Sequence, residues 1–394
     1  MWAALGPVGR MARGGYRRFA WTGADAELRA WFREQAEARG LRYEVDRNGN
    51  QWAWHGDPAR GDAVVTGSHL DSVPDGGAFD GPLGVVSAFA ALDLLRERGV
   101  AGRRPLGVVG FAEEEGARFG VACLGSRLTC GLLAPDRARR LTDADGVPLA
   151  AALERAGLDP DALGPDPERL ARIGAFVELH IEQGRALAGL DRAVGVGSAI
   201  WPHGRWRFDF GGEANHAGTT RVEDRRDPML TYAHTVLAAR KRARLAGALA
   251  TFGKVTTRPN AVNAVPERVT GWLDSRAPDA ATLEALVADI ERSAAERGGR
   301  DGVTVEVTRE SHTPGVEFAP GLRDGIAARL GGAPVLPTGA GHDAGILAAA
   351  VPTAMLYVRN PTGVSHAPGE HADTDDCLAG VTALADVLEG LVCR

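Results

Sequence analysis

The sequence predicts an α/β protein with a mostly parallel central sheet, into which a separate α+β domain is inserted. Two apolar runs, at residues 63–66 and 105–112, flank an apolar helical segment at residues 82–97. Strand, helix and strand in this order are typical of a parallel sheet. From about Trp201 the pattern of strands and helices changes, and the first pattern resumes near Leu322. An inserted domain explains this interruption better than two domains in sequence.

Length and composition agree with two folded domains and disfavour several kinds of partner. The chain has 394 residues, more than a single core usually supports, and 44% of them are hydrophobic. Its 45 basic and 51 acidic residues give a net charge of −6 without long like-charged blocks, which argues against a nucleic-acid-binding surface. No apolar run reaches about 18 residues, and the N-terminus resembles no secretory signal, so we predict a cytoplasmic protein. The four cysteines lack CxxC spacing, so we expect reduced thiols.

The first part of the chain has the pattern of a helix followed by a hairpin. Residues 25–39 are predicted to form an amphipathic helix that ends at Gly40. Residues 41–46 and 51–54 are predicted to be two strands joined by a tight turn. Another buried strand is expected at residues 175–179, after a surface region rich in Pro and Asp.

The inserted domain has its own order of elements. We expect strands at residues 205–210, 250–257, 268–275 and 303–308, and helices at residues 228–244 and 280–297. Two helices against a four-stranded antiparallel sheet form a compact α+β unit. After it, a helix at residues 322–330, strands at 334–338 and 353–358, and a helix at 373–391 continue the α/β pattern. We therefore place the inserted domain at residues 201–311 and the surrounding domain at residues 1–200 and 312–394.

The stretch from Gly67 to Gly81, GSHLDSVPDGGAFDG, is the part of the chain around which a function would be organised. It follows a predicted strand and combines the imidazole of His69 with several carboxylates among glycines. Open α/β sheets place their sites at the carboxyl ends of their strands, which favours a metal site here. Taken alone, the stretch is equally typical of a polar turn with a hydrogen-bonded histidine. Partners elsewhere in the chain must decide between the two interpretations.

Further metal-ligating residue types lie at the ends of other predicted strands. They are Glu114 and Glu115 after residues 105–112, His180 after residues 175–179, and His366 after residues 353–358, in addition to Asp80. Because neighbouring parallel strands end at the same edge of a sheet, these side chains can share one crevice. Imidazoles and carboxylates together suit two divalent ions about 3.5–4 Å apart with one bridging carboxylate. The mixed N/O donors indicate zinc, manganese or cobalt rather than calcium.

Two consecutive acids, Glu114 and Glu115, offer both a ligand and a base. An acid that binds no metal can take the proton of an attacking water and pass it to the departing nitrogen. Spacing alone does not decide which of the two is the ligand. Without His69 and His180, residues 113–115 would be interpreted as a solvated run of charge.

Seven motifs in this chain resemble those of the M20 metallopeptidase superfamily. In order they are GSHLDSVPDGGAFDGPLGV, FAEEEGARFG, ELHIEQG, NHAGTT, RPNAVNAVPE, GAGHDA and GVSHAPGEH. They are most similar to its amidase/carbamoylase branch, which contains N-carbamoyl-L-amino-acid hydrolases, β-alanine synthase and allantoate amidohydrolase. The resemblance covers nearly the whole chain. It implies a zinc-peptidase-like catalytic domain at residues 1–200 and 312–394, and a lid and dimerisation domain at residues 201–311.

The resemblance also implies roles for the residues at the strand ends. The implied ligands of two divalent ions, zinc or else manganese, cobalt or nickel, are His69, Asp80, Glu115, His180 and His366. Asp80 is then the bridge and Glu114 the general base, while Asp71 orients the imidazole of His69. His371 is an alternative last ligand, which we disfavour because the sequence around His366 matches the branch motif Ser-His-x-Pro-x-Glu.

The resemblance implies substrate contacts as well. His216 would donate to the oxyanion formed when water attacks the scissile carbonyl. Asn263 and Arg276 would bind the substrate α-carboxylate, to which a guanidinium offers two matched hydrogen bonds. Gln183, shortly after His180, is another expected contact. In the absence of the resemblance, His216 is a solvent-facing histidine and Arg276 a surface residue. Some of these residues are expected to reach a partner subunit.

We therefore expect a cytoplasmic, dimeric, metal-dependent hydrolase that removes the N-carbamoyl group from an L-amino acid to give the amino acid, ammonia and carbon dioxide. Allantoate amidohydrolase, which uses the same machinery on a ureide, is the alternative among enzymes. A non-catalytic small-molecule-binding protein is a second alternative, disfavoured because every ligand and the base have the required residue type. A serine hydrolase is disfavoured because the chain has no GxSxG nucleophile elbow. The expected partners are a small-molecule substrate and a second copy of the chain, without nucleic acid or membrane.

Overall fold

The computed structural model describes residues 1–394, and the chain divides into two compact units. The larger unit comprises Met1–Ala199 and Glu317–Arg394, and the smaller unit comprises Ile200–Val316. The predicted boundary after residue 311 falls inside a strand, Thr304–Thr313, that belongs to the sheet of the smaller unit. The last residues of this strand are mostly exposed and polar, so they carry no apolar signal in the sequence.

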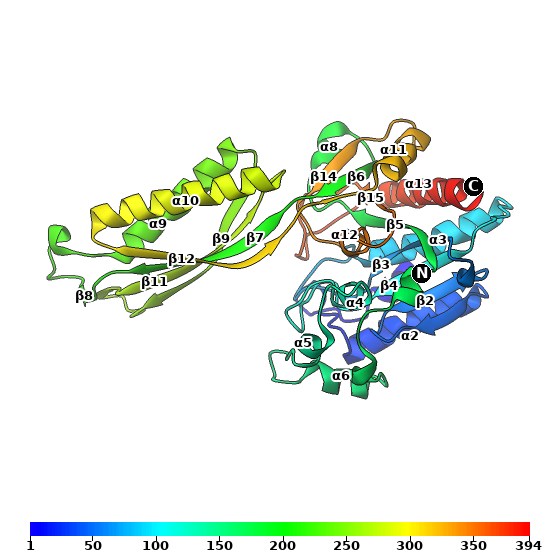
Figure 1. Ribbon diagram of the computed structural model, residues 1–394, viewed down its shortest axis with the longest axis horizontal. Coiled ribbons are helices and arrows are strands. Elements are labelled where there is room, and N and C mark those ends of the chain that lie inside the picture. The colour runs from blue at the N-terminus through cyan, green and yellow to red at the C-terminus, as the bar shows by residue number, and fades with distance from the viewer. The chain divides into compact units, whose positions relative to one another are not determined.

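The larger unit is built on a nine-stranded sheet, part of which is labelled in Figure 1. Its strands are β1 (Arg42–Val45), β2 (Gln51–His55), β3 (Ala63–His69), β4 (Leu106–Phe111), β5 (Ile173–Ile181), β6 (Val194–Ile200), β13 (Val316–Glu317), β14 (Val335–Thr338) and β15 (Thr353–Val358). Their order is β1-β2-β4-β3-β5-β15-β6-β13, and β14 pairs with β6. The four central strands β4, β3, β5 and β15 are parallel, whereas β1, β2 and β6 pair antiparallel with their neighbours. The predicted α/β architecture is confirmed, with its parallel part at the centre.

Strand β3 is longer than the sequence pattern indicated. All seven of its residues are buried, as expected for a parallel strand covered on both faces. The strand was predicted at residues 63–66, but the ladder with β4 continues to the pair His69↔Phe111. Backbone pairing therefore carries polar side chains, including Ser68 and His69, into the buried end of the sheet. The candidate site lies at this end.

The long helices of the larger unit pack on the sheet in one apolar cluster. Its helices are α1 (Trp2–Leu5), α2 (Gly23–Ala38), α3 (Pro82–Glu97), α4 (Leu124–Thr129), α5 (Pro135–Arg139), α6 (Leu149–Arg155), α7 (Pro167–Leu170), α8 (Ala186–Leu190), α11 (Pro320–Arg329), α12 (Asp343–Leu347) and α13 (Thr374–Val392). Residues of α2, α3, α11 and α13 share a core with the central strands. The sequence predicted these four and missed the others, each of which has seven residues or fewer. No helix of the chain combines the length and apolarity that a bilayer crossing requires.

Helix α3 begins directly after the central loop, and this placement positions Asp80. Pro82 stands at its first turn, where the missing amide hydrogen costs nothing, and Gly81 precedes it with a left-handed φ of 84°. The helix is apolar on nearly every side because it is buried between β3, β5 and α13. Asp80 is therefore held at the N-terminal end of a buried helix.

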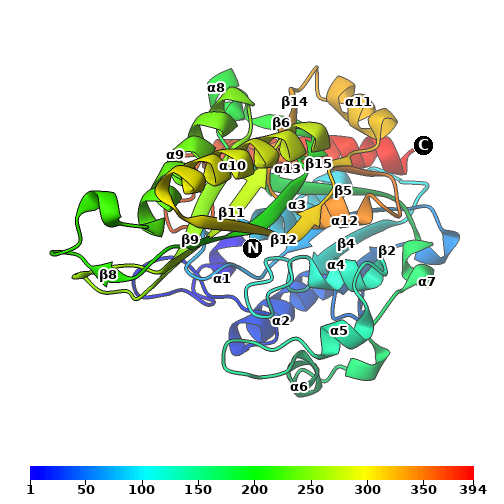
Figure 2. The same cartoon turned by 60° about the vertical axis from the view of Figure 1, so that its left-hand side comes forward.

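The smaller unit is a four-stranded antiparallel sheet with two long helices, as predicted. Its elements are β7 (His203–Gly211), β8 (Asn215–His216), α9 (Pro228–Leu245), β9 (Leu249–Arg258), β10 (Ala264–Val265), β11 (Arg268–Arg276), α10 (Ala280–Asp301) and β12 (Thr304–Thr313). The sheet order is β12-β7-β11-β9, and β8 pairs with β10 as a separate ribbon. Figure 2 shows α9 and α10 side by side on the sheet, with which they form the core of this unit.

Candidate metal centre

The four parallel strands bring the predicted site residues to one edge of the sheet. His69 is the last residue of β3, and His180 lies next to the end of β5. Glu114 and Glu115 follow β4, and His366 lies in the loop after β15. Because β4, β3, β5 and β15 are neighbours in this order, residues more than 290 positions apart in the sequence meet at their carboxyl ends.

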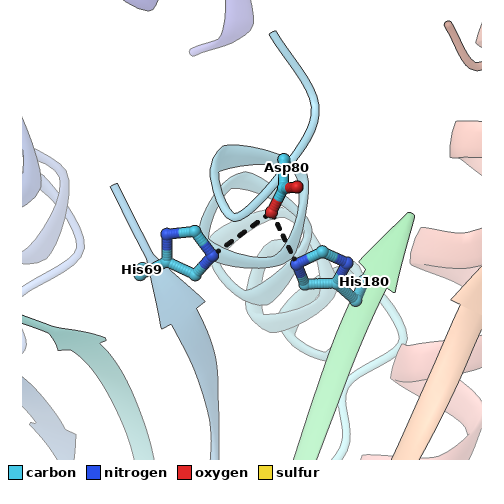
Figure 3. Close-up of side chains that lie close together, drawn as sticks. All are labelled: His69, Asp80 and His180. Carbon is cyan, nitrogen blue, oxygen red and sulfur yellow. Dashed lines mark ion pairs between the residues drawn. The ribbon is translucent and has the colours of Figure 1, made fainter. Parts of the chain in front are cut away.

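Asp80 stands between two imidazoles at this edge. Its Oδ1 atom lies 3.5 Å from Nε2 of His69 and 3.2 Å from Nε2 of His180. Figure 3 shows the carboxylate pointing between the two rings, which belong to separate strands. All three side chains are buried. These donor atoms could hold one metal ion between them.

The other oxygen of Asp80 faces a second group of donors. Oδ2 lies 3.4 Å from Nε2 of His366, which in turn lies 3.6 Å from Oε2 of Glu115. Asp80, Glu115 and His366 thus form a second set that could hold a metal ion. One carboxylate with each oxygen directed at a different donor group is the arrangement required of a ligand that bridges two cations.

Hydrogen bonds on the far side of the two buried rings show that the donor set fits metal ions. Nδ1 of His69 lies 3.1 Å from the carbonyl oxygen of Asp71, and Nδ1 of His180 lies 2.8 Å from that of Ile181. A carbonyl only accepts, so each Nδ1 carries a proton, and in a neutral ring Nε2 carries a lone pair. Both Nε2 atoms are buried without a hydrogen-bond partner and face a carboxylate. A cation between these lone pairs would satisfy all of them.

The electrostatics of the cluster favour a positive charge at the same place. Although burial disfavours the imidazolium, the carboxylates of Glu114, Asp71 and Asp80 raise the pKa of His69 well above its usual value. Burial, and then the charge of Asp80, raise the pKa of Glu115 to about 7. Several buried carboxylates that repel one another are stabilised by a nearby cation, whether it is a proton or a metal ion.

Glu114 belongs to the cluster but lies outside both donor groups. Its Oε2 atom is 3.7 Å from Nε2 of His69, and its Oε1 atom accepts a hydrogen bond from the thiol of Cys123 at 3.2 Å. Burial raises the pKa of Glu114 well above its usual value. Glu115, in contrast, approaches His366. Glu115 thus belongs to a donor group and Glu114 does not, while their division into ligand and free acid stays a prediction.

Asp71 contacts more of the site than the sequence indicated. We expected its carboxylate to orient His69, but the nearest acceptor for that ring is the backbone carbonyl of Asp71, with the carboxylate oxygen at 3.5 Å. The carboxylate instead accepts the backbone amides of Glu114 at 3.2 Å and Glu115 at 3.1 Å. Asp71 therefore fixes the backbone of both acids as well as the ring of His69.

Two further predicted residues of the larger unit have clear partners. Nε2 of Gln183 donates a hydrogen bond to Oδ2 of Asp80 at 2.7 Å. This predicted substrate contact therefore lies next to the carboxylate that we predict to bridge the two ions. His371, the alternative ligand, contacts Asp373 at 3.1 Å and belongs to neither donor group that contains Asp80. His366, rather than His371, thus lies in a donor group with Asp80, and its role as a ligand stays a prediction.

The predicted substrate residues of the smaller unit lie in two different parts of it. His216 and Asn263 are close together, because β8 pairs with β10 and the amide of Ala217 donates to the carbonyl of Asn263 at 3.0 Å. Arg276 is the last residue of β11 and donates to Asp274 at 3.0 Å. Their roles in substrate binding remain predictions.

Sequence reasoning assigned no role to two buried polar residues around the site, Glu178 and Glu370, whereas a third, His342, belongs to the recognised motif GAGHDA. Glu178 accepts hydrogen bonds from Ser68 at 2.7 Å and from the amide of Ala344 at 2.9 Å. His342 packs edge-on against His180, with 4.5 Å between ring centroids, and burial lowers its pKa well below the usual value. Glu370 accepts a hydrogen bond from the backbone amide of Asp80. Glu178 and Glu370 lie within or next to the recognised motifs, which is the only signal the sequence offers for them.

Comparison with known proteins agrees with this geometry. The chain matches the model of peptidase family M20/M25/M40 over residues 65–390, and it belongs to this family. It is therefore a hydrolase, and its relatives make it one that acts on linear amides.

Its relatives include enzymes of two specificities. The chain is 37% identical over 393 residues to an N-carbamoyl-L-amino acid amidohydrolase of Geobacillus stearothermophilus, covering 96% of this chain and 94% of that protein. It is 34% identical over 393 residues to the allantoate amidohydrolase of Escherichia coli K12, covering 98% and 95%. A solved structure of an amidase of the hydantoinase/carbamoylase family from Burkholderia multivorans is similar with a TM-score of 0.89 at 30% identity, covering 100% of this chain and 96% of that one. The predicted membership of this superfamily is confirmed.

Proposed function

We propose that the protein hydrolyses the N-carbamoyl group of an L-amino acid at a site for two divalent metal ions. The observation that carries this proposal is Asp80, whose two oxygens face separate donor groups. Relatives of this chain include N-carbamoyl-L-amino acid amidohydrolases, one of them 37% identical. Allantoate amidohydrolases, one of them 34% identical, support hydrolysis of a ureide as the second candidate.

The residues around the two proposed metal ions have different roles in the reaction. When bound, two divalent ions supply Lewis acidity that activates a water nucleophile and polarises the scissile carbonyl. Glu114 binds no metal in this scheme, takes the proton of the attacking water and returns it to the departing nitrogen. The thiol of Cys123 donates a hydrogen bond to Oε1 of Glu114, which leaves Oε2 to take this proton.

His216 is suited to the role of oxyanion donor. Its Nδ1 accepts the backbone amides of Gly218 at 3.0 Å and Thr219 at 3.1 Å. A nitrogen that accepts hydrogen bonds carries no proton, so the proton of the neutral ring is on Nε2. The ring is thus held in the tautomer that donates from its outer nitrogen, as stabilisation of an oxyanion requires.

The predicted carboxylate-binding pair, Asn263 and Arg276, is too far apart within one chain to hold one small substrate. Strand β11 pairs with β7 from Arg268↔Gly211 to Arg276↔His203. The ends of this nine-residue strand are separated by about 26 Å at roughly 3.3 Å per residue. His216 is in β8, and Asn263 directly precedes β10, which ends three residues before β11 begins at Arg268.

We therefore propose a homodimer in which Arg276 of one copy and the His216–Asn263 pair of the other act on the same substrate. The smaller unit offers a surface for such a partner. On α9, Leu230, Leu237 and Leu245 are exposed at spacings of seven and eight residues, so they lie on one side of the helix. Strand β9 is at the edge of the sheet, with unpaired backbone groups along its outer side and Leu249 exposed. The cytoplasmic location stays a prediction from the sequence.

A substrate panel tests the reaction. The purified chain is stripped of metal, restored with zinc, manganese, cobalt or nickel, and assayed for ammonia release. The substrates are several N-carbamoyl-L-amino acids, their D-enantiomers as matched controls, N-carbamoyl-β-alanine and allantoate. We expect the highest kcat/KM for one N-carbamoyl-L-amino acid, with its D-enantiomer far slower. Allantoate as the best substrate would establish the second candidate, and no release from any compound would refute both in favour of a binding protein.

A further inference from the structure

A buried carboxylate, Glu370, connects the two loops that carry Asp80 and His366. Glu370 lies in the loop between β15 and α13, four residues after His366, and is 5% exposed. Its Oε2 atom accepts the backbone amide of Phe79 at 2.9 Å and that of Asp80 at 3.0 Å. When the Glu370 carboxylate is ionised, these hydrogen bonds are charge-assisted and about twice as strong as neutral ones.

The surrounding backbone is shaped to receive this carboxylate. A Cβ atom on Gly77 would overlap the Glu370 side chain, so only glycine leaves room for it at this position. The other oxygen of Glu370, Oε1, is buried and has no hydrogen-bond partner. Burying an acid with one unsatisfied oxygen lowers the stability of the fold. A residue of this kind is kept where its other contacts are needed.

The two donor groups depend on this contact to different degrees. His69 and His180 lie on neighbouring strands of the hydrogen-bonded sheet, and their side chains are 1% exposed. His366 lies in a loop with a left-handed φ of 58°, and its side chain is 50% exposed. The sheet therefore fixes the two imidazoles of the first donor group, whereas His366 of the second group needs a link between its loop and Asp80.

We propose that Glu370 is a positioning residue that sets Asp80 and His366 in register and thereby builds the second cation position. This inference rests on the proposed dinuclear site. Glu370 belongs to neither donor group, and it acts through the backbone of Asp80 and through its own loop. The cation held by Asp80, Glu115 and His366 is the one that depends on it.

The test compares an acceptor with a non-acceptor of similar size. Glu370→Gln keeps an oxygen that can accept both amides, whereas Glu370→Leu keeps the bulk and loses every acceptor. Metal content is measured at a series of free zinc concentrations, together with kcat, KM and the melting temperature of the metal-free protein. We expect Glu370→Leu to retain one ion where the wild type holds two, with 10- to 100-fold weaker binding of the other, the usual range for residues that orient metal ligands. Glu370→Gln should restore the second ion to within a few-fold.

A control and a second variant separate this role from general destabilisation. Asp46 is a buried acid that accepts the amides of Asn48 and Asn50, and it belongs to neither donor group. Asp46→Asn should lower the melting temperature and leave two ions bound. Should Glu370→Leu fail to fold, Gly77→Ala displaces the Glu370 carboxylate by overlap without removing it and should weaken the same ion.

The outcomes distinguish this inference from the proposed function. Two ions bound with wild-type affinity in Glu370→Leu, or in Gly77→Ala where the former does not fold, would overturn the role of Glu370 and leave the dinuclear site intact. A wild-type chain that binds no metal at any concentration would overturn the dinuclear site itself.

Discussion

The thiol of Cys123 donates a hydrogen bond to Oε1 of Glu114 at 3.2 Å, which leaves Oε2 of this carboxylate directed at the buried imidazole of His69. The backbone holds the same pair together, because the amide of Cys123 donates to the carbonyl of Glu114 at 2.6 Å. Glu114 is thus fixed at both its main chain and its side chain, with one oxygen free to take a proton.

Replacing the proposed base should separate chemistry from metal binding. Glu114→Gln keeps the shape and an acceptor for Cys123 but cannot take a proton, so we expect kcat to fall by about 10²- to 10⁴-fold. Metal content should stay at the wild-type value. The matched control is Glu27→Gln on an exposed face of α2, which should change neither quantity. Turnover near the wild-type rate would remove Glu114 from the role of base.

Metal analysis tests the ligand set directly. We expect two ions per wild-type chain after reconstitution and fewer in His69→Ala, because this imidazole belongs to the first donor group. Metal at a hundredfold excess over its Kd should also stabilise the fold by about 2.7 kcal/mol, seen as a rise in melting temperature. The exposed His55 on β2 provides the control variant, His55→Ala. A fully active protein without metal would contradict the proposed mechanism.

Gly81 should be essential because a side chain there would collide with a ligand. A Cβ atom at this position would lie 2.5 Å from Nδ1 and 2.7 Å from Nε2 of His69, and the φ of 84° disfavours any residue but glycine. We expect Gly81→Ala to weaken metal binding and to destabilise the fold by about 1 kcal/mol or more. Gly325 in α11 has open space around it, so Gly325→Ala should be neutral or slightly stabilising. Unchanged metal affinity in Gly81→Ala would show that the ring of His69 can move without loss.

The proposed carboxylate anchor predicts an effect on KM. Arg276→Lys removes the planar fork that pairs with a carboxylate, so KM should rise about tenfold or more while kcat changes less. Arg205, which also lies beside Asp274 but is 69% exposed, supplies the control Arg205→Lys. If KM is the same in both variants, the substrate carboxylate is bound elsewhere.

A charge on the exposed face of α9 should disrupt the proposed dimer. Leu237 is 67% exposed, and an aspartate in its place would put an unpaired charge into an apolar interface. We expect Leu237→Asp to sediment as a monomer and to lose activity, since the proposed substrate site needs two chains. Leu378→Asp, on α13 of the larger unit, is the control and should leave the assembly unchanged. A wild-type chain that is monomeric and active would contradict the two-chain site.

The sequence predicted the parallel strands and indicated candidate ligands at their ends because both follow from local patterns. Apolar runs indicate buried strands, and the polar residues directly after them, such as His69, must lie at one sheet edge once the strands are neighbours. The role of Glu370 could not be predicted in this way, because its partner amides are 290 and 291 positions away in the sequence. Which buried acid meets which backbone amide is decided by tertiary packing.

The inserted unit shows a second limit of sequence reasoning. Motif resemblance named Asn263 and Arg276 as a pair, and each motif is local, so nothing in it measures the distance between them. The length of β11 separates the two residues, and only the ladder with β7 makes this visible. Likewise, the mostly exposed end of β12 carries no apolar signal, and the predicted domain boundary therefore fell inside it.

The smaller unit, Ile200–Val316, begins at the end of β6 and ends at the start of β13, and these two strands are hydrogen-bonded neighbours in the large sheet. Directly after it, the amide of Phe318 donates to the carbonyl of Ser198 at 3.1 Å. The smaller unit therefore takes the place of a loop that connects two neighbouring strands, β6 and β13. Insertions, deletions or wholesale exchange within it leave the order of the ligand-bearing strands untouched. Changes in this unit can therefore alter the side chains that it contributes while the strands that carry the two donor groups keep their order.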